Sequence, residues 1–209
     1  IQDRHQRWWA QNEDVGPVKF IAEKLIGREY AKSQEAKVPE LYYQCDRIEE
    51  LPDFSQFPDD FVIKPSRGWS AQNVFVLQSG LNLLDGEMWT REKIVEFIMT
   101  QPMNTNPKTK IVVEEFLKSW DGDYSIPLDY KFHMFGDHIS FISIVERNSN
   151  VNTKNNRYWF VDEHWQPLSG QVIKTQVHNA EPLVIPDCAD ELISTAKLLG
   201  KSVGMFMRI

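Results

Sequence analysis

The spacing of apolar residues along the chain predicts three amphipathic helices. In three segments, apolar side chains recur every three to four positions, which places them on one face of a helix. The predicted helices span residues 17–33, 91–101 and 190–204. A shorter helical turn is expected over 46–51.

Short runs rich in Val, Ile and Phe alternate with these helices and predict strands. The expected strands span residues 38–44, 61–64, 74–77, 111–117, 129–135, 139–145, 157–161 and 205–209. Gly136 and Asp137 favour a tight hairpin turn between two of them. Because short turns join most neighbouring strands, the sequence predicts an α+β fold with antiparallel sheets.

The first candidate site is a lysine at the end of a buried strand, in the segment "FVIKPSRGWSAQNV". Lys64 could bind phosphates there, and Ser66, Gly68 and Ser70 could form a loop that covers them with hydroxyl and backbone N–H groups. The segment is not a P-loop of the G-x-x-x-x-G-K-[ST] type. The alternative is a lysine whose ammonium group extends from a strand end into water.

The second candidate is the strand "IVVEEFL", which becomes polar at its end. Glu114 could accept a hydrogen bond from the amino group of adenine. Phe116 and Leu117 could supply main-chain and apolar contacts to the same base. An ordinary strand with a solvated acidic end remains the alternative.

The third candidate is the strand "DYKFHMF", in which polar and apolar residues alternate. The two-residue period of a strand puts Asp129, Lys131 and His133 on one face. Asp129 is suited to ribose hydroxyls and Lys131 to phosphate. The alternatives are an exposed sheet face with an Asp–Lys pair and a structural histidine.

The fourth candidate is the Asn-rich segment 148–156 with the cations around it. Arg147, Lys154 and Arg157 could cover a triphosphate or bind an acidic acceptor. A solvated surface loop explains the same composition.

Composition narrows the classes of function. The net charge of -7 argues against a nucleic-acid binder, because phosphate backbones require positive surface. The two cysteines, Cys45 and Cys188, lack the spacing of a zinc site and are expected to be reduced thiols. No apolar run is long enough for a membrane span, and the N-terminus is polar. These features predict a cytoplasmic protein without a membrane span.

Together and in this order, the segments resemble the ATP-grasp superfamily, and more closely its TupA-like branch of teichuronopeptide and cell-surface polysaccharide biosynthesis. The resemblance covers roughly residues 18–209. It depends on "LPDFSQFPDDFVIKPSRGWSAQNV", "IVVEEFL", "IPLDYKFHMFGDHISFI" and "MFMRI".

The resemblance implies a role for each matching residue. It implies that Lys64 binds the α- and β-phosphates, that residues 66–70 form the flexible phosphate loop, and that Asp129 lies near the ribose. Lys131 would contact phosphate, and Arg208 would lie beside the phosphate that is transferred. The implied adenine hinge consists of Glu114, Glu115, Phe116 and Leu117.

The resemblance also implies Mg²⁺ as a cofactor, held by an acid directly after Ile209 and by further acids one strand later. We therefore expect the metal ligands beyond Ile209 and none in this chain, which would be an incomplete copy of the fold. Trp69 and Gln72 replace glycines that are common in the phosphate loop.

The implied fold has two lobes that clasp a nucleotide between antiparallel sheets. The expected parts are an N-terminal extension (1–16), a helical lead-in (17–50), a small lobe (51–110) and a large lobe (111–209). The implied activity is an ATP-dependent ligase that activates a carboxylate as an acyl phosphate for attack by an amine. The acceptor would be a small molecule, an acidic sugar or a peptide.

Three other functions are compatible with the sequence. A kinase of the same fold would use the same ATP-binding residues. A non-catalytic nucleotide-binding module would need no metal ligands. An α+β interaction domain would bind no nucleotide at all.

Overall fold

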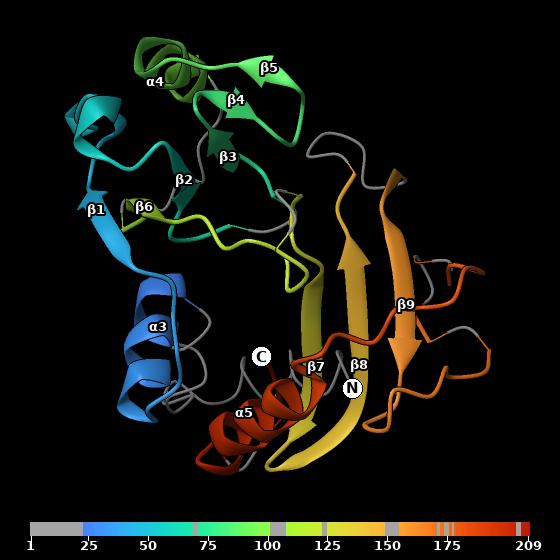
Figure 1. Cartoon of the computed structure of the whole chain (residues 1–209). Helices are drawn as coiled ribbons and strands as arrows, with labels where there is room; N and C mark the ends of the chain where they lie inside the picture. Colours follow the sequence, from blue (N-terminus) through green and yellow to red (C-terminus); the bar gives the residue numbers. More distant parts are fainter. Residues whose placement is uncertain are drawn as a thin grey trace.

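The computed structural model describes residues 23–68, 71–100, 108–122, 125–148, 155–170, 172–173, 176, 178–203 and 206–209. Within these ranges the chain is a mixed α+β protein with two antiparallel sheets (Figure 1), as the hydrophobic pattern predicted. The helices are α3 (Lys24–Ser33), α4 (Arg91–Thr100) and α5 (Ala189–Lys201), with single 3-10 turns at η1 (Ile48–Glu50) and η2 (Phe54–Gln56).

The six-stranded sheet has the order β1-β6-β2-β3-β4-β5. Its strands are β1 (Leu41–Cys45), β2 (Asp60–Pro65), β3 (Phe75–Gln78), β4 (Leu81–Asn82), β5 (Glu87–Met88) and β6 (Ile111–Glu115). The two-residue strands β4 and β5, and the turn η2, were not predicted. They are too short and too polar to show a hydrophobic period.

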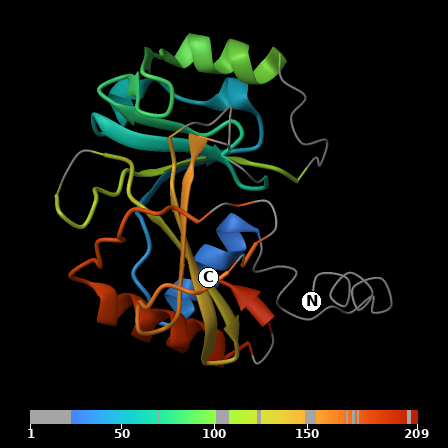
Figure 2. The same cartoon turned by 90° about the vertical axis from the view of Figure 1, so that its right-hand side faces the viewer.

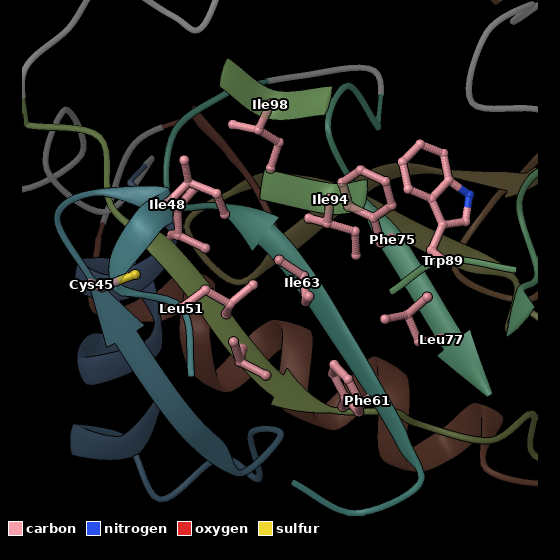
Figure 3. Close-up of a cluster of buried hydrophobic side chains, with 12 residues drawn as sticks. Cys45, Ile48, Leu51, Phe61, Ile63, Phe75, Leu77, Trp89, Ile94 and Ile98 are labelled. Carbon is pink, nitrogen blue, oxygen red and sulfur yellow. The ribbon is translucent and has the colours of Figure 1, made fainter. Parts of the chain in front are cut away.

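One face of this sheet packs against α4 to form the first core. Phe61 and Ile63 of β2 meet Ile94 and Ile98 of α4, which lie one helical turn apart (Figure 3). The indole of Trp89 contacts the edge of Phe75, with ring centroids 4.9 Å apart. Because strand side chains alternate between faces, Val62 and Lys64 of β2 lie on the opposite face.

The four-stranded sheet has the order β10-β7-β8-β9. Its strands are β7 (Asp129–Phe135), β8 (His138–Glu146), β9 (Arg157–Val161) and β10 (Phe206–Arg208). Helix α5 covers one face (Figure 2). On that face, Phe132 and Met134 share the second core with Ala196. The predicted alternation in β7 is thereby confirmed, because the apolar residues point into this core.

A glycine fixes the distance between α5 and the turn of the β7–β8 hairpin. A Cβ atom at Gly200 would lie 2.2 Å from the carbonyl oxygen of Gly136. Only a residue without a side chain allows the helix to approach this closely.

The six-stranded sheet extends across the predicted boundary between the two lobes at residue 110. Strand β6 is the first segment of the predicted large lobe, yet it pairs with both β1 and β2 in the six-stranded sheet. Strand β1 belongs to the same sheet, although we assigned it to the lead-in. The sheet pairs strands that are distant in sequence, and local patterns carry no information about such pairing.

Several other predictions can be compared with the described ranges. Helix α3 begins at Lys24, and the earlier part of the predicted helix lies outside the described residues, as does the extension 1–16. Cys45 and Cys188 are free thiols, and burial raises the pKa of Cys45 to about 11. Among the helices of the described ranges, none has the length and apolar character needed to cross a bilayer.

Candidate functional site

Lys64 and Glu114 form an ion pair on the face of the six-stranded sheet that points away from α4. Strands β2 and β6 are paired so that Lys64 lies opposite Val112, and Glu114 lies opposite Val62. The Lys64 ammonium donates to Glu114 Oε1. The two side chains are 23% and 12% exposed, so the pair is largely shielded from water.

A pocket of about 250 Å³ lies between this ion pair and helix α3. Lys24 and Arg28 line it from α3, one helical turn apart, and Lys64 and Glu114 line it from the sheet. Burial and then the Lys64 ammonium lower the pKa of Lys24, against the opposing effects of Glu23 and Glu114. The buried Nε of Arg28 has no hydrogen-bond partner among the described residues. Three cations and one carboxylate line the pocket, so the net charge of its lining is positive.

The predicted phosphate loop begins beside this pocket. Ser66 is 1% exposed, and its hydroxyl oxygen accepts from the backbone N–H of Lys110. The exposed Gly68 has a positive φ of 133°, and its carbonyl lies 3.4 Å from the Lys24 ammonium, which donates to it. Ser70 and Trp69 lie outside the described residues. Ser66 thus fixes the strand end, and a phosphate contact by its hydroxyl stays a prediction.

The four residues of the predicted adenine hinge lie in different surroundings. Glu114 is bonded to Lys64, and Glu115 Oε2 accepts from the backbone N–H of Glu40 at 2.9 Å. Phe116 is buried against Val76 and Leu84. Leu117 is 49% exposed. Contacts of these residues with adenine stay predictions.

Asp129 binds two cations on the face of the four-stranded sheet that points away from α5. Its Oδ2 accepts from the Lys131 ammonium and, at 2.7 Å, from the Arg147 guanidinium. Burial raises the pKa of Asp129, but the charges and hydrogen bonds of Lys131 and Arg147 outweigh burial and leave the pKa below its ordinary value. Burial also lowers the pKa of Lys131, Asp129 opposes that shift, and Arg147 and Arg208 strengthen it.

His133 and Arg208 extend this cluster along the same face. They occupy paired positions on β7 and β10, so their side chains share a side of the sheet. The imidazole stacks on Phe141 with centroids 4.0 Å apart, and its Nε2 lies 3.2 Å from Ser143 Oγ. Burial, Arg208 and Lys131 together lower the pKa of His133 to about 4.

A larger pocket, of about 580 Å³, lies at the end of β8. Arg147 and Asn148 line it from the two positions after β8, Leu83 from the turn after β4, and Trp120 and Ile126 from the segment between β6 and β7. The pocket therefore lies between segments of both sheets. Arg147 joins it to the Asp129 cluster through the shared carboxylate.

The predicted residues thus fall into two ionic clusters, one on each sheet. Lys64 and Glu114 belong to the first, and Asp129, Lys131 and Arg208 belong to the second. Neither of the two pockets is lined by both Lys64 and Lys131. The crevice expected between two sheets that clasp one nucleotide is therefore not present in either pocket, and contact of Lys64 and Lys131 with the same nucleotide stays a prediction.

The cationic loop contributes one of its three predicted residues to the clusters. Arg147 binds Asp129, whereas Arg157 pairs with Glu181 at 2.9 Å and with Glu146 at 3.7 Å. Lys154 lies outside the described residues.

Sequence reasoning missed the two cations of α3. Lys24 and Arg28 are spaced by four residues, so they lie on one face of the helix. The sequence shows that spacing, but it does not show which face of the helix lies against β2 and β6. The described residues contain no group of three His, Cys, Asp or Glu side chains placed to hold a metal ion. Binding of Mg²⁺ stays a prediction.

No protein-family model, curated protein or solved structure matches the chain significantly. Functional assignment therefore depends on the geometry and on the sequence resemblance.

Proposed function

We propose that the protein is an ATP-dependent ligase of the ATP-grasp type, and that it forms an acyl phosphate from a carboxylate for attack by an amine. The TupA-like resemblance favours a cytoplasmic role in polysaccharide or peptide-conjugate biosynthesis. The observation that carries the proposal is the excess of cations on the free face of the four-stranded sheet. Lys131, Arg147 and Arg208 lie there with a single interacting carboxylate, Asp129, among the described residues.

This cluster suits a polyphosphate chain. Arg147 and Arg208 both lower the pKa of Lys131, which means that the three cations repel one another in the free protein. A bound triphosphate would offset this repulsion, and charge-assisted bonds to phosphate are stronger than neutral ones. Lys64, with Lys24 and Arg28 beside it, offers a second group of cations on the other sheet.

In the proposed reaction, a carboxylate oxygen attacks the terminal phosphorus of ATP, and the bond to ADP breaks. The amine then attacks the acyl carbon, loses a proton, and displaces inorganic phosphate. Lys131 and Arg208 would hold the transferred group and stabilise its charge, so positioning and electrostatics supply the catalysis. Mg²⁺ bound together with the nucleotide would neutralise further phosphate charge.

Nucleotide binding tests the proposal directly. ATP with Mg²⁺ at millimolar concentration should raise the melting temperature of the wild-type protein, because a ligand that binds the folded state stabilises it. Lys131→Gln should remove most of this shift. Lys93→Gln, an exposed change on α4, should leave it intact.

An unchanged wild-type melting temperature with ATP would contradict the proposal. Where ATP binds, the products separate the remaining possibilities. Release of free phosphate with amide formation supports a ligase, whereas a stable phosphorylated acceptor identifies a kinase. Binding without turnover in the full-length protein identifies a non-catalytic module.

A further inference from the structure

His133 is adjacent to two cations that the proposed function assigns to phosphate. Lys131 precedes it by two residues on β7, and Arg208 occupies the paired position on β10. Residues two apart on one face of a strand are about 7 Å apart. A phosphate chain that contacts both Lys131 and Arg208 therefore lies next to the imidazole, which is adjacent to each of them.

We propose that His133 is a third ligand of the phosphate chain and binds it as the protonated imidazolium, so that nucleotide binding takes up a proton. This inference depends on the proposed function, because it takes a polyanion as the ligand of this face. Ser143 Oγ lies beside Nε2, which leaves Nδ1 as the ring atom that could donate to phosphate.

The groups that face His133 explain why the ring would become protonated only when the ligand binds. Lys131 on β7 and Arg208 on β10 are positively charged, and Ser143 and Phe141 on β8 are uncharged. Without a ligand, burial and the two cations hold the pKa of the ring at about 4, so the ring is neutral near pH 7. A polyanion against the same cations reverses the sign of the local potential and favours the charged ring.

The direction of the pH dependence follows from this change. The pKa of His133 is higher in the complex than in the free protein, so binding tightens as the pH falls through the pKa of the complex. The gain levels off near pH 4, where the free protein is also protonated. A single linked proton changes the binding constant by at most about tenfold per pH unit.

Calorimetry in buffers of different ionisation enthalpy measures the proton uptake. ATP with Mg²⁺ should bind the wild-type protein at pH 6 with more proton uptake than the His133→Gln variant, the difference approaching one proton. The nucleotide itself can gain or lose protons on binding. That contribution is the same for both proteins, so it drops out of the difference between them. His138→Gln, a change at an exposed histidine, should match the wild type. Equal proton uptake by all three proteins would overturn the inference and leave the proposed function intact.

A second measurement separates failure of the inference from failure of the proposed function. The pKa of the His133 ring is followed by NMR with and without inorganic tripolyphosphate, and the His133→Gln variant identifies the resonance. We expect the pKa to rise from about 4 to about 7 with tripolyphosphate, which is the rise that an uptake of nearly one proton at pH 6 requires. If ATP does not bind but this rise occurs, the proposed function fails and the anion site stands. An unchanged ring pKa with tripolyphosphate overturns the inference.

Discussion

At the scale of single residues, Asp129 has the largest electrostatic role among the described side chains of the second cluster. One of its oxygen atoms accepts hydrogen bonds from two cations that are themselves mostly shielded from water. Removal of its charge would leave Lys131 and Arg147 together without a counter-ion, and unpaired buried charges are unfavourable.

We predict that Asp129→Asn lowers the free energy of unfolding by about 1–2 kcal/mol at pH 7, a range reduced for the partial exposure of the carboxylate. The folded-state pKa of Asp129 lies below its ordinary value. Its contribution is therefore fully present above the unfolded pKa of about 3.9 and is lost as the pH falls through the folded pKa.

Urea denaturation at several pH values measures this contribution. The wild type and Asp129→Asn should differ at pH 7 and converge toward pH 2–3, roughly one unit or more below the unfolded pKa. Glu92→Gln, which removes an exposed carboxylate on α4, should have little effect throughout. A difference that stays constant with pH would show that Asp129 acts through packing rather than through charge.

Several site features at this scale were predictable from the sequence, and others were not. The alternation in "DYKFHMF" placed Asp129, Lys131 and His133 on one face, because strand period depends only on local sequence. The contact between Asp129 and Arg147 joins residues 18 positions apart across a hairpin. Lys64 and Glu114 are 50 positions apart, and their pairing depends on strand register that no local pattern reveals.

At the scale of elements, helix α5 packs against the hairpin of β7 and β8 in the second core. Gly200 allows the helix to contact the turn at Gly136 without a side chain between them. The periodic spacing of apolar residues identified α4, α5 and β7, because each buries one regular face. Strand β2 was predicted from its short apolar run. The strands β4 and β5 have two residues each, which is too short for a period.

We predict that Gly200→Ala destabilises the protein by about 1–3 kcal/mol, although alanine favours helix more than glycine does. The added methyl group would overlap the Gly136 carbonyl oxygen at 2.2 Å, so the helix or the turn must move. Denaturation in urea measures the change. Ser194→Ala, at an exposed position of the same helix, should be neutral or slightly stabilising. A Gly200→Ala protein as stable as the wild type would show that α5 moves without cost.

At the scale of the whole molecule, two antiparallel sheets each carry an ionic cluster on the face that their main core leaves free. The sequence predicted antiparallel sheets, but it did not predict which strands each sheet contains. Long-range pairing places β6 between β1 and β2, and this pairing brings Glu114 to Lys64. The proposed ATP-grasp function requires that a single nucleotide contacts both clusters, because the expected fold clasps the nucleotide between its two sheets.

A double-mutant cycle on ATP binding tests that claim most directly. Calorimetric titration with ATP and Mg²⁺ is performed on the wild type, Lys64→Gln, Lys131→Gln and the double variant. We predict one binding site per chain and a loss of about tenfold in affinity for each single change, the size expected for a charge-assisted bond to phosphate. Two bound nucleotides per chain, or a full loss from one lysine and none from the other, would contradict a site shared by the two sheets.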